Sequence, residues 1–231
     1  MASSWRWAVE MGARHGEVAR VGSLIVLLLA GGVAAAAAPP DEEAAANHGG
    51  AAPWEGRASL AAYFLPDESN YLIPIAAVDH GGLHLEARYN YEDRRTGTVF
   101  AGWNFEFGGA VEGAVTPMLG AVLGRTNGVA PGRELTLGWG PLEYYHETEV
   151  VFDLGNSANS YFYAWAELSA AATEWFRAGV ALQRMRVFQS SRELTPGPFV
   201  RFSVSRFELS AYWFAPGADD QYAAVSLGVQ F

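Results

Sequence analysis

The sequence of 231 residues contains neither cysteine nor lysine. Without cysteine, the chain can form no disulfide scaffold and no thiolate metal site. Its 15 basic residues are therefore all arginines, and 25 acidic residues outnumber them to give a formal net charge of −10. Because nucleic-acid binding needs a basic face, this charge balance argues against nucleic acid as a partner.

Long apolar runs are also scarce, since half of the residues are hydrophobic while the mean hydropathy stays close to zero. The exception is Val21–Val33, which follows three arginines and precedes the small-residue run Ala34–Ala38. A basic N-terminal region, an apolar stretch and a small-residue cleavage region are typical of a signal peptide. We expect cleavage near Ala36 or Ala37. The alternative is a permanent membrane anchor, because the run extended through Ala38 nearly reaches spanning length.

These features predict three regions. Residues 1–36 form the signal peptide, residues 37–56 a disordered periplasmic leader, and residues 57–231 the folded domain. The leader is mostly Ala, Pro, Gly and acidic residues, which offer too little apolar surface for folding.

Beyond the leader, apolar and polar residues alternate. Between Leu83 and Tyr91, for example, apolar residues alternate with His84, Glu86, Arg88 and Asn90. Candidate strands lie near 58–65, 71–79, 83–92, 97–107, 110–122, 133–139, 142–153, 160–170, 175–188, 197–204, 206–214 and 221–231. Pro74 and Pro117 fall inside two of them, where we expect bulges or strand ends because proline donates no ladder hydrogen bond.

The connections between these strands alternate in length. Polar loops, the longest expected over Leu123–Gly132, take turns with tight links such as Gly140-Pro141. This order closes naturally into a barrel. The sequence therefore predicts an all-β, up-and-down antiparallel transmembrane β-barrel of twelve strands, with ten as the alternative count.

Bulky aromatic residues on the apolar phase favour a lipid-facing exterior. Trp103, Phe107, Trp139 and Phe152 lie near strand ends, as in the aromatic girdles of membrane barrels. His146 shares this phase although it is polar, so we expect its segment to rise above the membrane on the loop side. A soluble exported barrel that binds an apolar ligand would show the same alternation with its apolar face inside, and it remains an alternative.

The end of the sequence carries a resemblance. A closing strand with alternate apolar residues before a final phenylalanine resembles Gram-negative outer-membrane β-barrels. The residues of this pattern are Tyr222, Val225, Leu227, Val229 and Phe231. The resemblance implies a location in the outer membrane, contact with its lipid, and recognition of this strand by the barrel-assembly machinery.

The polar phase predicts the residues that line the lumen. They are His84, Glu86, Arg88, Asn104, Glu106, Glu143, Glu147, Glu149, Glu167, Arg177, Arg201 and Glu208. Acids with some arginines opposite indicate either a small passive pore for small polar or cationic solutes, or an interior of paired charges in a structural membrane protein.

Enzymatic and metal sites are weakly supported. A surface lipid-modifying enzyme would have to use His146 with the loop serines Ser157 and Ser160, but no nucleophile motif surrounds them. The spacing of His80 and His84 suits a metal only on a helix, and here a glycine turn separates them. We therefore predict no enzyme activity, no cofactor and no metal.

Overall fold

The computed structural model describes residues 53–66, 69–157, 160–187 and 193–231, so the predicted signal peptide and most of the predicted leader lie outside the described residues. The strands are β1 (Trp54–Phe64), β2 (Tyr71–His80), β3 (Leu83–Tyr89), β4 (Thr96–Trp103), β5 (Phe105–Phe107), β6 (Glu112–Gly124), β7 (Gly128–Trp139), β8 (Leu142–Asp153), β9 (Tyr161–Ala171), β10 (Phe176–Val187), β11 (Glu193–Val204), β12 (Phe207–Phe214) and β13 (Tyr222–Gln230). Among these residues, no helix has the length and apolarity to cross a membrane.

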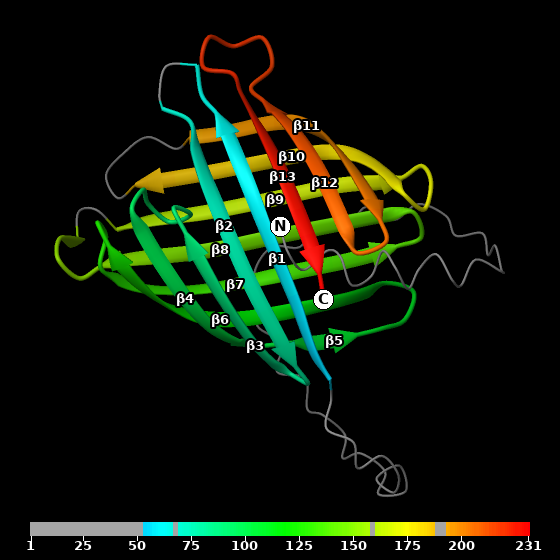
Figure 1. Ribbon diagram of the computed structural model, residues 1–231, viewed down its shortest axis with the longest axis horizontal. Helices are drawn as coiled ribbons and strands as arrows, with labels where there is room; N and C mark the ends of the chain where they lie inside the picture. The colour runs from blue at the N-terminus through cyan, green and yellow to red at the C-terminus, as the bar shows by residue number, and fades with distance from the viewer. Residues whose placement is uncertain (1–52, 67–68, 158–159, 188–192) are drawn as a thin grey trace, which may run out of the picture.

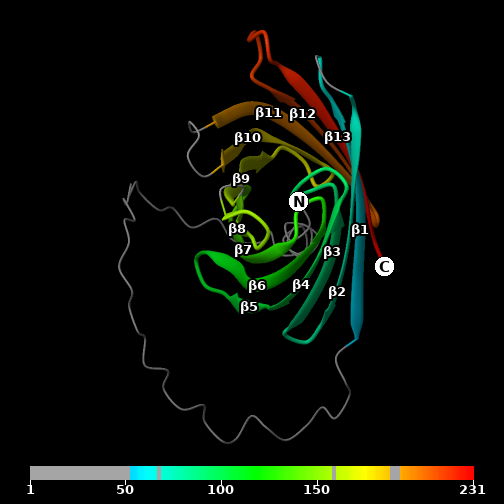
Figure 2. The same ribbon diagram turned by 90° about the vertical axis from the view of Figure 1, so that its left-hand side faces the viewer.

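Each strand pairs antiparallel with its neighbours in sequence, except that β4 and β5 do not pair with each other, and β1 pairs with β13 to close the sheet into a barrel. β4 and β5 both pair with β6 and are separated only by Asn104, so together they count as one strand of the barrel wall. The barrel therefore has the twelve strands that the sequence predicts. Figure 1 shows the strongly tilted strands, and Figure 2 places β1–β3 on one side of the interior and β8–β10 on the other.

The interruption at Asn104 has a local cause in Pro117. Pairing of β4 with β6 stops at Gly102↔Met118, and pairing of β5 resumes at Phe105↔Val115. Pro117 lies opposite the gap, where its missing N–H removes a ladder bond, which confirms the expected interruption. Pro74 instead pairs with Leu60 in an unbroken register on the β1 side, and the β2–β3 ladder begins one residue later.

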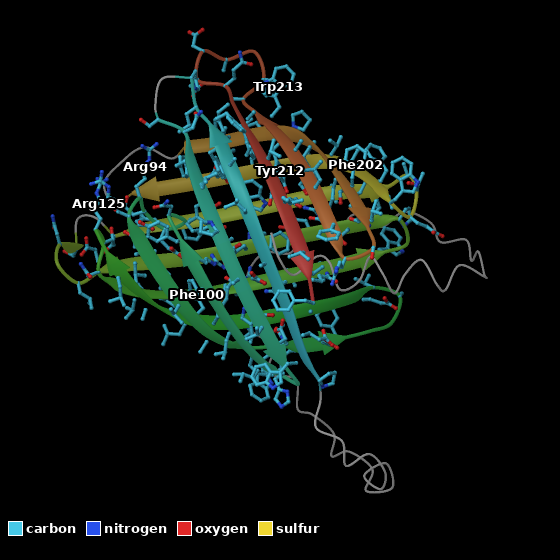
Figure 3. The ribbon with its side chains drawn as sticks, viewed as in Figure 1. Arg94, Phe100, Arg125, Phe202, Tyr212 and Trp213 are labelled. Atoms are coloured by element: carbon cyan, nitrogen blue, oxygen red, sulfur yellow. The ribbon has the colours of Figure 1, made fainter. Side chains whose placement is uncertain are left out.

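The two ends of the barrel differ in their connections, and we call them the loop end and the turn end. The loop end carries the connection between β1 and β2 and every second connection after it, whereas the turn end carries tight links such as Gly81-Gly82 and Gly140-Pro141. Figure 3 shows Arg94 and Arg125 at the loop end and Phe202 towards the turn end. The predicted alternation of connections is therefore present.

Two boundaries differ from the sequence prediction. The predicted loop Leu123–Gly132 is wrong, because β6 continues to Gly124 and β7 begins at Gly128. Its Gly and Pro content suggests a loop, yet Val129 is exposed while Ala130 is fully buried, so the strand alternation continues through it. β1 likewise begins at Trp54, three residues before the predicted start of the folded domain.

The closing strand lies with its apolar phase outward. Leu227 is 56% exposed and Phe231 is 70% exposed, whereas Ser226 between the apolar residues is buried. The amide of Phe231 donates to the carbonyl of Gly56, and the Phe231 ring covers the space that a side chain at Gly56 would need. The start and the end of the barrel thus meet at the turn end.

The outer face is apolar over most of the barrel. Val99, Trp103 and Leu119 are each more than half exposed, and further aliphatic and aromatic residues are exposed on the same phase of the other long strands. The phase between them points inward and is largely polar. A soluble barrel would have the opposite arrangement, so this face fits a hydrocarbon environment.

One region of the outer face departs from this pattern. Arg133 on β7 is exposed there, and it interacts electrostatically with Tyr144 and His146 on β8. It lines a hollow of about 340 Å³ together with Pro117, Pro131 and other residues of β6 to β9. The expectation that His146 rises above the membrane at the loop end is wrong, because it is the fifth residue of β8 counted from the turn end.

Candidate functional site: a charged barrel interior

Two connected groups of charged side chains occupy the interior. The Arg88 network consists of Arg57, Asp79, His84, Glu86, Arg88, Asn104, Thr116, Glu134, Tyr145, Glu147 and Glu149. The Arg201 network consists of Glu143, Trp165, Glu167, Ser169, Arg177, Arg201, Glu208, Ser210 and Tyr212. Strand alternation aims these side chains inward, and antiparallel register places them at matching heights.

Arg88 is the centre of the first network. Its guanidinium donates to Glu86 on the same strand and to Glu147 on β8. Glu134 and Glu149 each lie 3.7 Å from one of its nitrogens. The rings of Tyr91 and Phe100 lie 4.5 Å and 4.7 Å from the guanidinium carbon, so cation–π contacts add to the charge pairing.

The network joins opposite walls of the barrel. Arg57 on β1 donates to Asp79 on the neighbouring strand at 3.0 Å and approaches Glu134 on β7 at 3.7 Å. In the closed strand order, β1 and β7 lie on nearly opposite sides. The interior at this level is therefore spanned by side chains, which leaves at most a narrow passage.

Asp79 organises the turn end of the network. One carboxylate oxygen bonds His84 Nδ1 at 2.9 Å and accepts from the Asn104 side chain at 2.6 Å. Asn104 in turn accepts from the hydroxyl of Thr116 at 2.6 Å. The break between β4 and β5 thus turns Asn104 inward, where its amide links β2 to β6.

The Arg201 network lies nearer the turn end on the β8–β12 wall. Arg201 donates to Glu167 at 2.6 Å and lies 3.2 Å from Glu208. Glu167 also accepts from Trp165 at 2.9 Å and from the hydroxyl of Tyr212 at 2.8 Å. Both oxygens of Glu167 therefore accept hydrogen bonds, and the pairing holds Arg201 against the wall.

Aromatic side chains line the loop half of the interior. They include Tyr63, Tyr71, Tyr91, Tyr161, Tyr163, Phe214 and Tyr222. Tyr212 is buried among the aromatic and charged groups, whereas the next residue, Trp213, is half exposed on the outer face (Figure 3). The interior therefore changes from charged groups near the turn end to tyrosine-rich surface near the loop end.

Glu92 lies at the loop end, in the connection between β3 and β4. It is 4% exposed, and burial raises the pKa of its carboxyl above the ordinary glutamate value. The hydroxyl of Tyr161 donates to its backbone carbonyl. This bond fixes the loop segment over the interior.

The structure brings most of the predicted lumen residues into these networks. His84, Glu86, Arg88, Glu143, Glu147, Glu149, Glu167, Arg177, Arg201 and Glu208 are all buried inside, and Asn104 is partly buried there. Glu106 is the exception, because it lies exposed on the short strand β5 at the turn end. The break at Asn104 leaves β5 only three residues long, so its middle residue, Glu106, lies at the rim of the barrel and not inside it.

Sequence reasoning misses four charged members of the interior: Arg57, Asp79, Glu92 and Glu134. Arg57 and Glu134 lie near the starts of β1 and β7, which the sequence prediction places too late. Asp79 is the last residue of its predicted strand and stands next to a predicted turn. Arg57 is four residues before Ala61 and therefore on the same inward face of β1, and this alternation is the signal from which Arg57 could have been assigned to the interior.

The residues considered for catalysis do not meet. His146 is on the outer face of β8 and stacks on Tyr144 with ring centroids 6.0 Å apart. Ser160 is buried and accepts from the backbone amide of Asp153. His80 stacks on Trp54, while His84 bonds Asp79, and within the described ranges no group of three or more acidic, His or Cys side chains could hold a metal ion.

A closed barrel with an apolar outer face and a charged, hydrogen-bonded interior is a transmembrane β-barrel. Among solved structures, the fold is similar to KdgM porin, with 10% identity and a TM-score of 0.53 over 76% of this chain and 98% of that chain. A structure of KdgM porin in complex with disordered oligogalacturonate gives 10% identity and a TM-score of 0.54 over the same shares.

A third structure, the Acinetobacter baumannii outer membrane protein Omp33, gives 9% identity and a TM-score of 0.42 over 77% of this chain and 98% of that chain. No protein-family model matches the sequence, and the search of curated proteins found no match. The first two comparisons establish a KdgM-like barrel fold, and the function has to be inferred from the residues of this chain.

Proposed function

We propose that the protein is a passive pore of a Gram-negative outer membrane that passes small polar or cationic solutes without acting as an enzyme. The observation that carries the proposal is the charge of the interior. Among the described side chains, nine carboxylates face four guanidinium groups there. The carboxylates are those of Asp79, Glu86, Glu92, Glu134, Glu143, Glu147, Glu149, Glu167 and Glu208, and the guanidinium groups are those of Arg57, Arg88, Arg177 and Arg201.

An excess of carboxylates along a lumen attracts cations and repels anions. This argues against transferring the ligand of the KdgM complex to this chain. Oligogalacturonate is a polyanion, and the interior described here would oppose its entry electrostatically. The shared fold supports a pore, while the charge of this interior favours a different class of solute.

Planar-bilayer recording of the refolded barrel tests the proposal. Under a KCl gradient, we expect a reversal potential of the sign that K⁺ permeation produces. Replacement of K⁺ by tetraethylammonium should sharply reduce the current, because Arg57 and Glu134 approach to 3.7 Å across the interior. A pore that prefers anions would contradict the proposal that excess carboxylates set the selectivity of the interior.

A structural membrane protein is the second candidate, and the tight burial of the arginines favours it. Arg88 is 4% exposed and Arg201 is 3% exposed, so both are held by partners from several strands. A correctly folded, heat-modifiable barrel that shows no current in bilayers would support this role over the pore.

We further propose that β13 carries the signal for the barrel-assembly machinery. Its outward residues Val225, Leu227 and Phe231 are exposed and Val229 is half-buried, and together they form an apolar stripe beside the β1–β13 closure. Phe231→Ala should lower the amount of assembled barrel in the outer membrane several-fold, measured by heat-modifiable mobility. Phe202→Ala removes an outward ring distant from the closure, and equal assembly defects in both variants would contradict a specific signal.

A further inference from the structure

Glu149 differs from the other carboxylates of the interior in how it is partnered. Its side chain is 0% exposed, and neither carboxylate oxygen accepts a hydrogen bond from a described residue. The guanidinium of Arg88 lies 3.7 Å from it, but that group donates its hydrogen bonds to Glu86 and Glu147. Glu149 therefore holds buried acceptor capacity that the neighbouring arginine does not satisfy.

The charges around Glu149 do not balance. Counting Glu92 with the Arg88 network, six carboxylates share this part of the interior. They are Asp79, Glu86, Glu92, Glu134, Glu147 and Glu149, and the opposing guanidinium groups are Arg57 and Arg88. Even with His84 protonated beside Asp79, negative charge remains in excess. Buried charge without a partner is costly, so these carboxylates need additional positive charge, which either a bound proton or a bound cation can supply.

The surroundings of Glu149 suit a small cation. In the β8–β9 register, Glu149 lies opposite Tyr163, whose ring packs edge-on against Tyr91 with centroids 5.4 Å apart. Glu92 interacts electrostatically with Glu149 from the loop end. Phenol oxygens and ring faces both attract cations. Carboxylates and tyrosines from three parts of the chain thus converge on the boundary between the charged and aromatic halves.

We infer that a small monovalent cation of about the size of K⁺ binds beside Glu149, between Glu92 and Tyr163. The inference rests on the proposed pore only for the route by which the cation arrives. During permeation, the cation would bind on the loop side of the constriction made by Arg57 and Arg88. The absence, among the described residues, of a three-ligand metal cluster favours a loosely held monovalent ion over a tightly coordinated metal.

The thermal unfolding of the detergent-refolded barrel tests this site without requiring conduction. At constant ionic strength, replacing N-methyl-D-glucamine by K⁺ should raise the unfolding midpoint of the wild type by roughly 3–6 °C when K⁺ is at about ten times its Kd. Glu149→Gln should abolish this rise. It should also raise the midpoint in N-methyl-D-glucamine, because it removes a buried charge without changing the shape of the side chain.

Glu92→Gln provides a second variant if Glu149→Gln refolds poorly, and it should weaken the response to K⁺. Glu174→Gln, at an exposed position in the turn after β9, is the matched control and should respond to K⁺ like the wild type. A wild-type midpoint that is insensitive to K⁺ would overturn the site. So would a midpoint that rises only on acidification, because protons would then supply the missing positive charge.

Bilayer recordings separate this inference from the proposed function. A barrel that is silent in bilayers but stabilised by K⁺ through Glu149 would refute the pore and retain the cation site. A barrel that conducts cations with unchanged selectivity and unchanged K⁺ stabilisation in Glu149→Gln would retain the pore and refute the site.

Discussion

Arg88→Met is expected to destabilise the barrel by about 3–5 kcal/mol, because it leaves buried carboxylates without their cation. In the wild type, the Arg88 guanidinium donates to Glu86 and Glu147 and lies 3.7 Å from Glu134 and Glu149. Methionine fills much of the same volume but supplies neither charge nor donors. Urea unfolding in lipid vesicles at neutral pH measures the change in the free energy of unfolding.

A second substitution distinguishes lost charge pairing from lost packing. Glu147→Gln in the Arg88→Met background removes one carboxylate left without its cation, so part of the stability should return. Arg125→Met is the control, because Arg125 is 68% exposed and lies 3.5 Å from Asp93 at the loop end. A surface pair of this kind contributes about 0–1 kcal/mol.

If Arg88→Met is as stable as the wild type, the carboxylates around it are well hydrated. The interior would then be wider than these contacts indicate, and pairing would not hold the barrel together. The same result would strengthen the case for a water-filled pore, so the variant informs both candidate functions.

The fold is predictable from the sequence because a membrane barrel places each strand between two different environments. The alternation of Leu83, Leu85 and Ala87 with His84, Glu86 and Arg88 is enough to identify the two faces of β3. Loop-end and turn-end connections differ in length, which indicates the up-and-down order. Strand starts are less predictable, since the Gly and Pro residues from Gly128 to Gly132 fit a loop and a strand equally well.

The membership of the candidate site is partly predictable, but its pairing is not. Periodicity assigns a residue to the inside without naming its partner, and Arg88 and Glu147 are 59 residues apart. Contacts across the barrel, such as Arg57 with Glu134, depend on the strand number and stagger of the closed sheet. Arg57 also precedes the first predicted strand, near 58–65, although its side chain reaches the centre of the network.

The outer face provides the second large effect, at Arg133. Arg133 lies six residues from Trp139 at the turn end and five from Gly128 at the start of β7. With a strand rise of about 3.4 Å and a tilt near 45°, this places it roughly 14 Å above the level of Trp139. The apolar band of such barrels is about 25 Å tall, so Arg133 lies near its middle.

Arg133→Leu is therefore expected to stabilise the barrel by about 2–4 kcal/mol in phospholipid vesicles, the approximate cost of an arginine at the midplane. Leucine would also fill part of the hollow lined by Pro117 and Pro131. The free energy of unfolding from urea titration measures the gain, and Arg125→Leu at the loop end should give a much smaller change. A loss of stability in Arg133→Leu would mean that another polar group satisfies Arg133, and that this part of the wall does not face hydrocarbon.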